Sequence, residues 1–120
     1  MTVKPIDSFD EAVAFALTLP DTELSTSYGK PAVKVKSNGR AFLYTGHEHQ
    51  ESFGIAIDME MIEILKETDP DTFFQTPHYE GWPAVLVRFG SKDPERVRAM
   101  IERSRDWTAA KKPPKSGKRK

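Results

Sequence analysis

Apolar residues recur at helical spacing near both ends of the chain and alternate with polar residues in between. Near the N-terminus, four apolar residues share one side of a helix: Phe9, Val13, Ala16 and Leu17. Ser8 and Glu11 match a capping box, in which the Ser8 hydroxyl accepts from the Glu11 amide and the Glu11 carboxylate returns to the Ser8 amide. The pattern predicts a core-facing helix that begins at Ser8 and ends before Pro20.

Two more helices are predicted further along the chain. Asp58 caps a helix over residues 59–67 that turns three residues inward: Met61, Ile62 and Leu65. Asp93 caps the last helix, with Pro94 at its first position. The inner side of that helix is formed by Val97, Met100, Ile101, Ser104, Trp107 and Thr108. Its outer arginines alternate with Glu95, Glu102 and Asp106, which favours ion pairs within the helix over a basic patch.

Between the helices, the polar and apolar alternation predicts strands near residues 23–28, 32–36, 40–44, 52–57 and 83–89. Short turns separate these strands. We therefore expect an α+β fold with two layers, in which a mostly antiparallel sheet is covered on one face by the N- and C-terminal helices. The length fits a single domain over residues 1–110. Residues 111–120 contain no large apolar side chain, and they predict a disordered basic tail.

The strongest local signal is a hairpin around Asn38 and Gly39, because a type I′ turn requires positive φ at both central positions. If Ser37 pairs with Arg40, alternation sorts the flanking residues onto two faces. The predicted core face pairs Val35 with Phe42 and Val33 with Tyr44. The opposite face carries Lys34 and Lys36 beside Ala41 and Leu43. One face of the hairpin is then apolar and the other is basic.

An aromatic segment from Phe73 to Pro83 precedes the most apolar strand. Prolines at both ends of its second half predict an extended Pro77-His78-Tyr79, and Glu80-Gly81 then supplies a turn that brings Tyr79 near Trp82. Two interpretations remain open. The segment is either an aromatic corner packed on the sheet, which we favour, or a surface that stacks nucleobases or another planar ligand.

This segment also carries a family resemblance. Thr76-Pro77-His78-Tyr79-x-Gly81-Trp82, followed by an apolar strand, resembles the MmcQ/YjbR family of small bacterial proteins. The likeness continues in Ala16-Leu17-x-Leu19-Pro20, in Gly29-Lys30-Pro31-Ala32-x-Lys34-Val35 and in Asp93-Pro94-Glu95, so that it covers about residues 8–110. The resemblance implies an α+β fold likened to bacterial frataxin, with a double-wing motif described as DNA-binding. A shared fold alone does not establish that function.

Charge is distributed unevenly along the chain. The formal net charge is zero, but six of the 18 basic residues follow Ala110, which leaves residues 1–110 with 12 basic and 18 acidic residues. An acidic body argues against strong DNA binding unless its cations gather on one face. The chain has no cysteine, no apolar run of the ~20 residues that span a bilayer and no apolar signal-peptide core near Met1, so we expect a cytoplasmic protein without disulfides.

The sequence offers little catalytic chemistry. His47 and His49 flank Glu48, but no third ligand stands at a spacing typical of zinc sites. Neither a phosphate-binding glycine loop nor a nucleophile elbow is present, and Gly29-Lys30-Pro31 is typical of a turn. We therefore expect a protein that is not an enzyme, that needs no metal or cofactor and that does not bind membranes.

Two functional hypotheses follow. The first is a DNA-binding module that contacts phosphates through the hairpin residues Lys34, Lys36 and Arg40. The aromatic residues would supply a second contact in that module: His78, Tyr79 and Trp82. The alternative is a small-ligand or protein-interaction domain that uses the same aromatic residues. The oligomeric state stays open, with a monomer slightly favoured. Salt-dependent binding to DNA would separate the hypotheses, because phosphate contacts release counterions.

Overall fold

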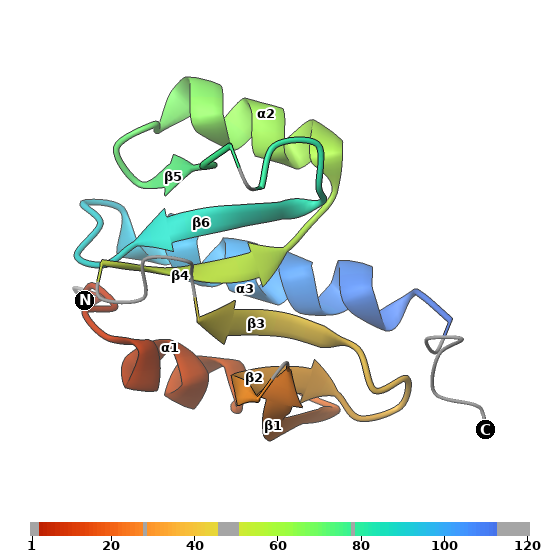
Figure 1. The fold of residues 1–120 in the computed structure, drawn as a ribbon. Helices are drawn as coiled ribbons and strands as arrows, with labels where there is room; N and C mark the ends of the chain where they lie inside the picture. Colours follow the sequence, from red (N-terminus) through yellow and green to blue (C-terminus); the bar gives the residue numbers. More distant parts are fainter. Residues whose placement is uncertain (1–2, 28, 46–50, 78, 113–120) are drawn as a thin grey trace.

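The computed structural model describes residues 3–27, 29–45, 51–77 and 79–112, which form an antiparallel sheet with three helices (Figure 1). The helices are α1 (Phe9–Ala16), α2 (Met59–Thr68) and α3 (Pro94–Ala109). The strands are β1 (Thr22–Ser27), β2 (Lys30–Val35), β3 (Ala41–Thr45), β4 (Ser52–Ala56), β5 (Phe73–Phe74) and β6 (Ala84–Arg88). Their order in the sheet is β1-β2-β3-β4-β6-β5, and every neighbouring pair is antiparallel.

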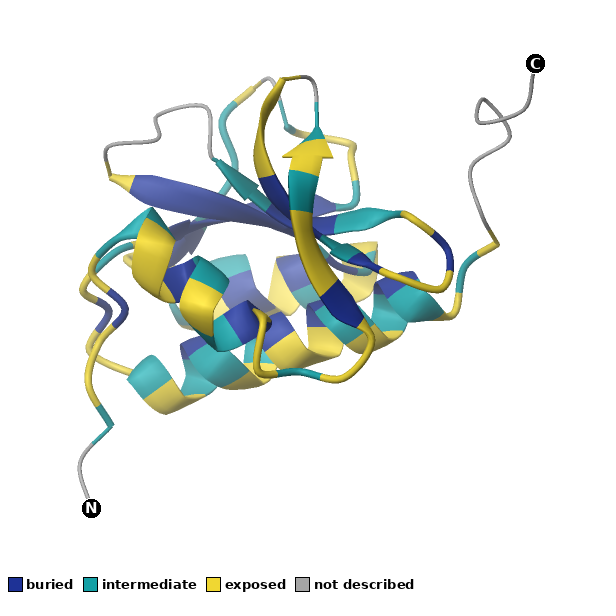
Figure 2. Cartoon of the chain, turned by 90° about the horizontal axis from the view of Figure 1, so that it is seen from below, coloured by how far each residue is buried: buried dark blue, intermediate teal, exposed yellow. Residues whose placement is uncertain are grey.

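The core lies between one face of the sheet and the helices. Strand residues on this face, among them Leu43, Ile55 and Val85, are fully buried. They pack in one cluster with Ala12 of α1 and Ile101 of α3, and Figure 2 shows these helices covering the sheet from below. The predicted two-layer α+β fold is therefore confirmed. Helix α2 packs beside β5 and β6 and adds Ile62 and Leu65 to the same cluster.

Strand β5 was not predicted from the sequence, because its two residues are too few to show alternation. Phe73 pairs with Val87 and Phe74 with Leu86, which places β5 at one edge of the sheet. The opposite edge is β1, most of whose residues are half-buried or exposed (Figure 2). The other predicted strands agree with the structure to within a few residues at their ends.

Each helix begins at the predicted cap. Ser8, Asp58 and Asp93 accept hydrogen bonds from backbone amides in the first turns of α1, α2 and α3. One detail of the capping box was wrong: the Glu11 carboxylate accepts from the amide of Asp7, at 2.8 Å, and not from that of Ser8. The carboxylate reaches one residue further back, and the capping function is the same.

The outer arginines of α3 contact other elements more than their own helix. Arg103 pairs with Asp58 at 3.2 Å, Arg98 donates to the Lys4 carbonyl, and Arg105 donates to the Pro20 carbonyl as well as contacting Asp106. The predicted ion pairs within the helix were therefore largely wrong. These arginines fasten α3 to the ends of neighbouring segments, so they are engaged within the fold and form no free basic surface.

The register of the β2–β3 hairpin differs from the predicted one. Val33 pairs with Leu43 and Lys34 with Ala41, so that Phe42 is an extra residue in β3. At such a bulge two successive side chains can point to the same face, and both Phe42 and Leu43 are fully buried in the core. The predicted pairs of Val35 with Phe42 and of Val33 with Tyr44 were wrong, as was the place of Leu43 on the basic face. The predicted neighbourhood of Lys34 and Ala41 is confirmed.

Candidate functional site

The turn between β2 and β3 is anchored to the end of α3. The Val35 carbonyl accepts from the Gly39 amide at 2.8 Å, which closes a loop longer than a two-residue turn. Gly39 has a φ of 72°, whereas Asn38 has no positive φ, so the predicted type I′ turn was wrong. Asn38 instead turns inward. It is 8% exposed, and its side-chain amide donates to the carbonyls of Thr108 and Lys111 at 2.8 and 3.0 Å.

A gap between β3 and β4 allows α3 to reach this end of the sheet. The ladder between the two strands stops at the pair Leu43–Ile55. Just beyond it, the Ser104 hydroxyl of α3 contacts the carbonyls of Phe42 and Ala56, one from each strand. The carbonyls at the ends of the two separated strands thus keep a hydrogen-bond donor. The part of α3 that follows Ser104 lies beside the gap between the strands.

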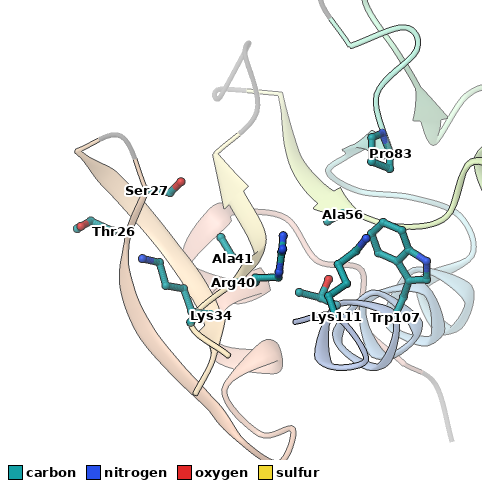
Figure 3. Close-up of a pocket in the computed structure, with 11 residues that line it drawn as sticks. Thr26, Ser27, Lys34, Arg40, Ala41, Ala56, Pro83, Trp107 and Lys111 are labelled. Atoms are coloured by element: carbon teal, nitrogen blue, oxygen red, sulfur yellow. The ribbon is translucent and has the colours of Figure 1, made fainter. Parts of the chain in front are cut away.

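An open groove of about 480 Å³ occupies this corner of the molecule (Figure 3). It is bordered by β1, β2, the hairpin turn, the ends of β3 and β4, and the last turns of α3. We call it the basic groove, because its three charged residues are all cations: Lys34, Arg40 and Lys111. No acidic residue occurs among the described residues that line it. Thr26, Ser27, Gly39, Ala41, Ala56, Pro83, Trp107 and Thr108 complete the lining.

The three cations come from different elements and are held differently. Lys34 is half-buried on β2. Arg40 donates through Nε to the carbonyl of Lys112, which fixes the guanidinium near the end of α3. The Nζ atom of Lys111 lies 3.9 Å from the centre of the Trp107 ring, a cation–π contact. Figure 3 shows Lys34 extending toward Thr26 and Ser27 on one side of the groove, Lys111 lying against Trp107 on the other, and Arg40 between them.

The sequence predicted part of this group. Lys34 and Arg40 were predicted together and both line the groove, but Lys36 is exposed and is not among the lining residues. Lys111 was missed because it was assigned to a disordered tail. Its position four residues after Trp107 was the available signal, since residues at this spacing share a helix face. Residues 113–120 of the predicted tail lie outside the described residues.

The segment after β5 is not extended as predicted. The Tyr79 amide donates to the Thr76 carbonyl at 2.8 Å, so Pro77 sits inside a turn, where its fixed φ suits the second position. The predicted turn at Gly81 is confirmed: its φ is 86°, and the Trp82 amide donates to the Tyr79 carbonyl. His78 lies outside the described residues, as do His47 and His49.

Gln75 holds this loop together. Its side-chain amide donates to the carbonyls of Tyr79, Trp82 and Ala84, at 3.2, 3.3 and 2.7 Å, and its oxygen accepts from Lys66. The Trp82 side chain is nevertheless not packed within this loop, because it is 65% exposed. Of the two aromatic residues described here, only Tyr79 is half-buried. The favoured aromatic corner was therefore wrong for Trp82.

Two tyrosines lie on the sheet face opposite the helices. The ring of Tyr44 covers Gly54, where an added Cβ would meet the ring at 2.5 Å. Burial, and secondarily the charge of Tyr79, raises the pKa of Tyr44, and burial also raises the pKa of Tyr79. Both hydroxyls therefore stay neutral, and neither is poised to act as a base near neutral pH.

The structure offers no sign of a metal site or a membrane span in the residues that it describes. No three side chains of the His, Asp or Glu type are grouped so as to hold a metal ion there. No helix within the same ranges is long and apolar enough to cross a bilayer. Asp58 lines a neighbouring hollow that shares Trp107 with the groove. Burial opposes ionisation of Asp58, but its hydrogen bonds from Arg103 and the Met61 amide outweigh it and keep its pKa below the ordinary value.

Fold and groove together define a small α+β domain whose sheet carries a cationic groove at one end. A family model for YjbR matches residues 17–107, which is more than half of the chain. The chain therefore belongs to the YjbR family, in agreement with the resemblance seen in its sequence. A search of curated proteins and a search of solved structures each gave no match.

Proposed function

We propose that this protein is a non-enzymatic DNA-binding protein that contacts phosphates through the basic groove. The observation that carries the proposal is the convergence of Lys34, Arg40 and Lys111 from three elements on one groove whose lining includes no acidic residue. Convergent cations are the electrostatic footprint of a polyanion site, because each neutralised phosphate releases bound counterions.

The acidic composition of the body is compatible with this proposal. Three exposed glutamates lie on α2, a helix that packs against β5 and β6 and does not border the groove: Glu60, Glu63 and Glu67. Charges on opposite parts of a protein interact weakly at physiological salt, because the Debye length there is about 8 Å. Nearer to the groove, a hollow that shares Trp107 with it is lined by Asp58, Glu102 and Asp106, and Asp58 is paired there with Arg103. The charge of the groove lining, and not the net charge of the body, is therefore the relevant property.

Further cations follow the groove residues in the sequence. The described part of the chain ends at Lys112, whose carbonyl accepts a hydrogen bond from the Arg40 guanidinium. Four more basic residues follow Lys112 in the sequence: Lys115, Lys118, Arg119 and Lys120. We propose that they add unspecific phosphate contacts to those of the groove, which would strengthen binding without conferring sequence preference.

A matched pair of substitutions tests the proposal. Lys34→Glu and Lys36→Glu make the same charge change two residues apart, but only Lys34 lines the groove. Lys34→Glu should weaken DNA binding by about tenfold or more at moderate salt and reduce the magnitude of the salt slope by about 1. Lys36→Glu should change affinity by about twofold or less. Fluorescence anisotropy with labelled oligonucleotides at several salt concentrations measures both effects.

Controls separate the groove from its surroundings. Neutralising Glu60, Glu63 and Glu67 to glutamine should alter affinity far less than Lys34→Glu does. Truncation after Lys112 should weaken binding and leave the Lys34→Glu effect in place. If truncation abolishes binding while Lys34→Glu has no effect, the C-terminal residues are the binding element and the groove proposal is wrong.

The exposed Trp82 favours a second candidate function. An indole that is 65% exposed is typical of a residue that contacts a partner, since tryptophan is enriched in interface hot spots. A parent protein with no measurable DNA binding would support a protein-interaction or small-ligand domain that uses this residue. In that case Trp82→Ala should impair partner binding, and Lys34→Glu should not.

A further inference from the structure

We infer that the basic groove accepts single-stranded DNA in preference to duplex DNA. This inference rests on the proposed function and specifies its substrate. Three observations support it: the anchored hairpin turn, the concave shape of the site and the aromatic side chains at its border.

The hairpin turn is not available as an inserting wing. Asn38, at its centre, is 8% exposed and donates two hydrogen bonds to carbonyls at the end of α3. Direct readout of base edges in the major groove of a duplex typically uses a helix or a β-ribbon that enters the groove. Undocking Asn38 would break both hydrogen bonds, one of them buried, and would expose a side chain that is now buried, which is costly. The tip of the hairpin therefore stays packed against the end of α3.

The site is a depression and not a ridge. Its volume of about 480 Å³ lies within the range of about 300–1,000 Å³ that is usual for small-molecule pockets. Its cations line the depression, which suits a phosphate that can enter it. The phosphates of a duplex lie on a wide cylinder, whereas a single strand can bend and place one phosphate and its base inside such a depression.

Aromatic side chains stand beside the cations. Trp107 lines the groove and is half-buried, with Lys111 against its ring at 3.9 Å. Pro83 also lines the groove, and its chain neighbour Trp82 is 65% exposed. Unpaired bases stack on aromatic rings and on cations that flank them, while bases within a duplex are already stacked on each other.

The groove also contains neutral hydrogen-bonding groups. Thr26 and Ser27 of β1 border it. Thr108 lines it too, is only 2% exposed, and its hydroxyl has no hydrogen-bond partner among the described residues. The Thr108 hydroxyl is itself closed off from the groove, so the hydroxyls of Thr26 and Ser27 are the ones that can donate to a phosphate oxygen there.

The test compares two DNA probes on the full chain. An oligothymidylate of about 12 nucleotides, within the usual site sizes of about 4–16, is compared by anisotropy with a duplex of the same length. The single strand should bind at least about tenfold more tightly. Equal or tighter binding of the duplex would overturn this inference and leave the DNA-binding proposal standing. Absence of binding to both probes would overturn both.

Tryptophan fluorescence locates the bound base. In a Trp82→Phe variant, Trp107 is the one remaining tryptophan, and the substitution lies at an exposed position that should tolerate it. The oligothymidylate should quench its emission, and the quenching should disappear at high salt together with binding. Binding without any change in Trp107 emission would overturn the stacking part of the inference. Inorganic phosphate alone should leave the emission unchanged.

Discussion

Two segments of this protein are each held by a single amide side chain, but with different consequences. Asn38 joins the β2–β3 turn to the end of α3, across about 70 residues of sequence. Gln75 joins carbonyls of the loop between β5 and β6, none more than nine residues away. The first anchor brings three elements around one groove. The second shapes a local loop and leaves Trp82 exposed.

The two anchors also differ in their access to water. Asn38 is buried, and so is its hydrogen bond to the Thr108 carbonyl, where water cannot readily replace it. Gln75 is half-buried, and its contact with the Trp82 carbonyl is exposed. A buried amide that joins distant segments should therefore matter more for stability and binding than an amide that organises a partly solvated loop. The following predictions test this difference.

Asn38→Ala should have the largest effect on stability. The substitution removes the side-chain donor of the Lys111 carbonyl, one of the two donors of the Thr108 carbonyl and the acceptor of the Arg40 amide, so we expect the free energy of unfolding to fall by about 2–3 kcal/mol. Chemical denaturation measures the change. Ser37→Ala, at the exposed neighbouring position, is the matched control and should change the free energy by less than about 0.5 kcal/mol. Equal effects at both positions would contradict the anchoring role of Asn38.

Alanine at the two turn glycines should cost a similar, smaller amount. Gly39 and Gly81 have φ values of 72° and 86°, and an added Cβ at either position would meet no atom within 4 Å. Each substitution should therefore cost about 1–2 kcal/mol from backbone strain alone. DNA affinity distinguishes them, because only Gly39 lines the basic groove. A loss of affinity confined to Gly81→Ala would show that the loop after β5, and not the hairpin turn, forms the site.

Gln75→Ala should lower the free energy of unfolding by about 1 kcal/mol, since water can reach part of the loop and replace its donor. Trp82 emission should change, because the carbonyl of that residue loses a contact. Affinity for DNA should stay within about twofold of the parent value. A larger effect on stability than that of Asn38→Ala would reverse the proposed order of the two anchors.

Ionisation of the two tyrosines should have the smallest of these effects on stability. Burial raises the pKa of both Tyr44 and Tyr79 in the folded protein. Their neutral forms are therefore favoured by folding, and this stabilisation is complete below the unfolded pKa of about 10 and is lost as pH rises from there toward the folded values. Thermal unfolding between about pH 9 and 11 should show falling stability. Tyr79→Phe should make the fall shallower, and an unchanged slope would contradict the assignment.

What the sequence could predict follows from the range of the interactions. Lys34 and Arg40 were placed together because alternation along a hairpin is a local pattern. The inward turn of Phe42 was missed, since a bulge interrupts that alternation. Lys111 reaches the groove because its carbonyl accepts a hydrogen bond from the Asn38 side chain. The two residues are far apart in the sequence, and the residues around neither one indicate the other. Pro77 was read as extended because its place in a turn depends on the Thr76 carbonyl.

The most direct test of the central claim is a titration of isotope-labelled protein with the oligothymidylate, followed by amide chemical shifts. The shifts should move together at Arg40, Ala41 and Lys111, which belong to different elements of the groove, and at the Trp107 indole N–H. Residues of α2, such as Glu63, should stay unchanged. Saturable shifts that cluster on α2, or on the loop around Trp82 without the groove, would contradict the basic groove as the binding site.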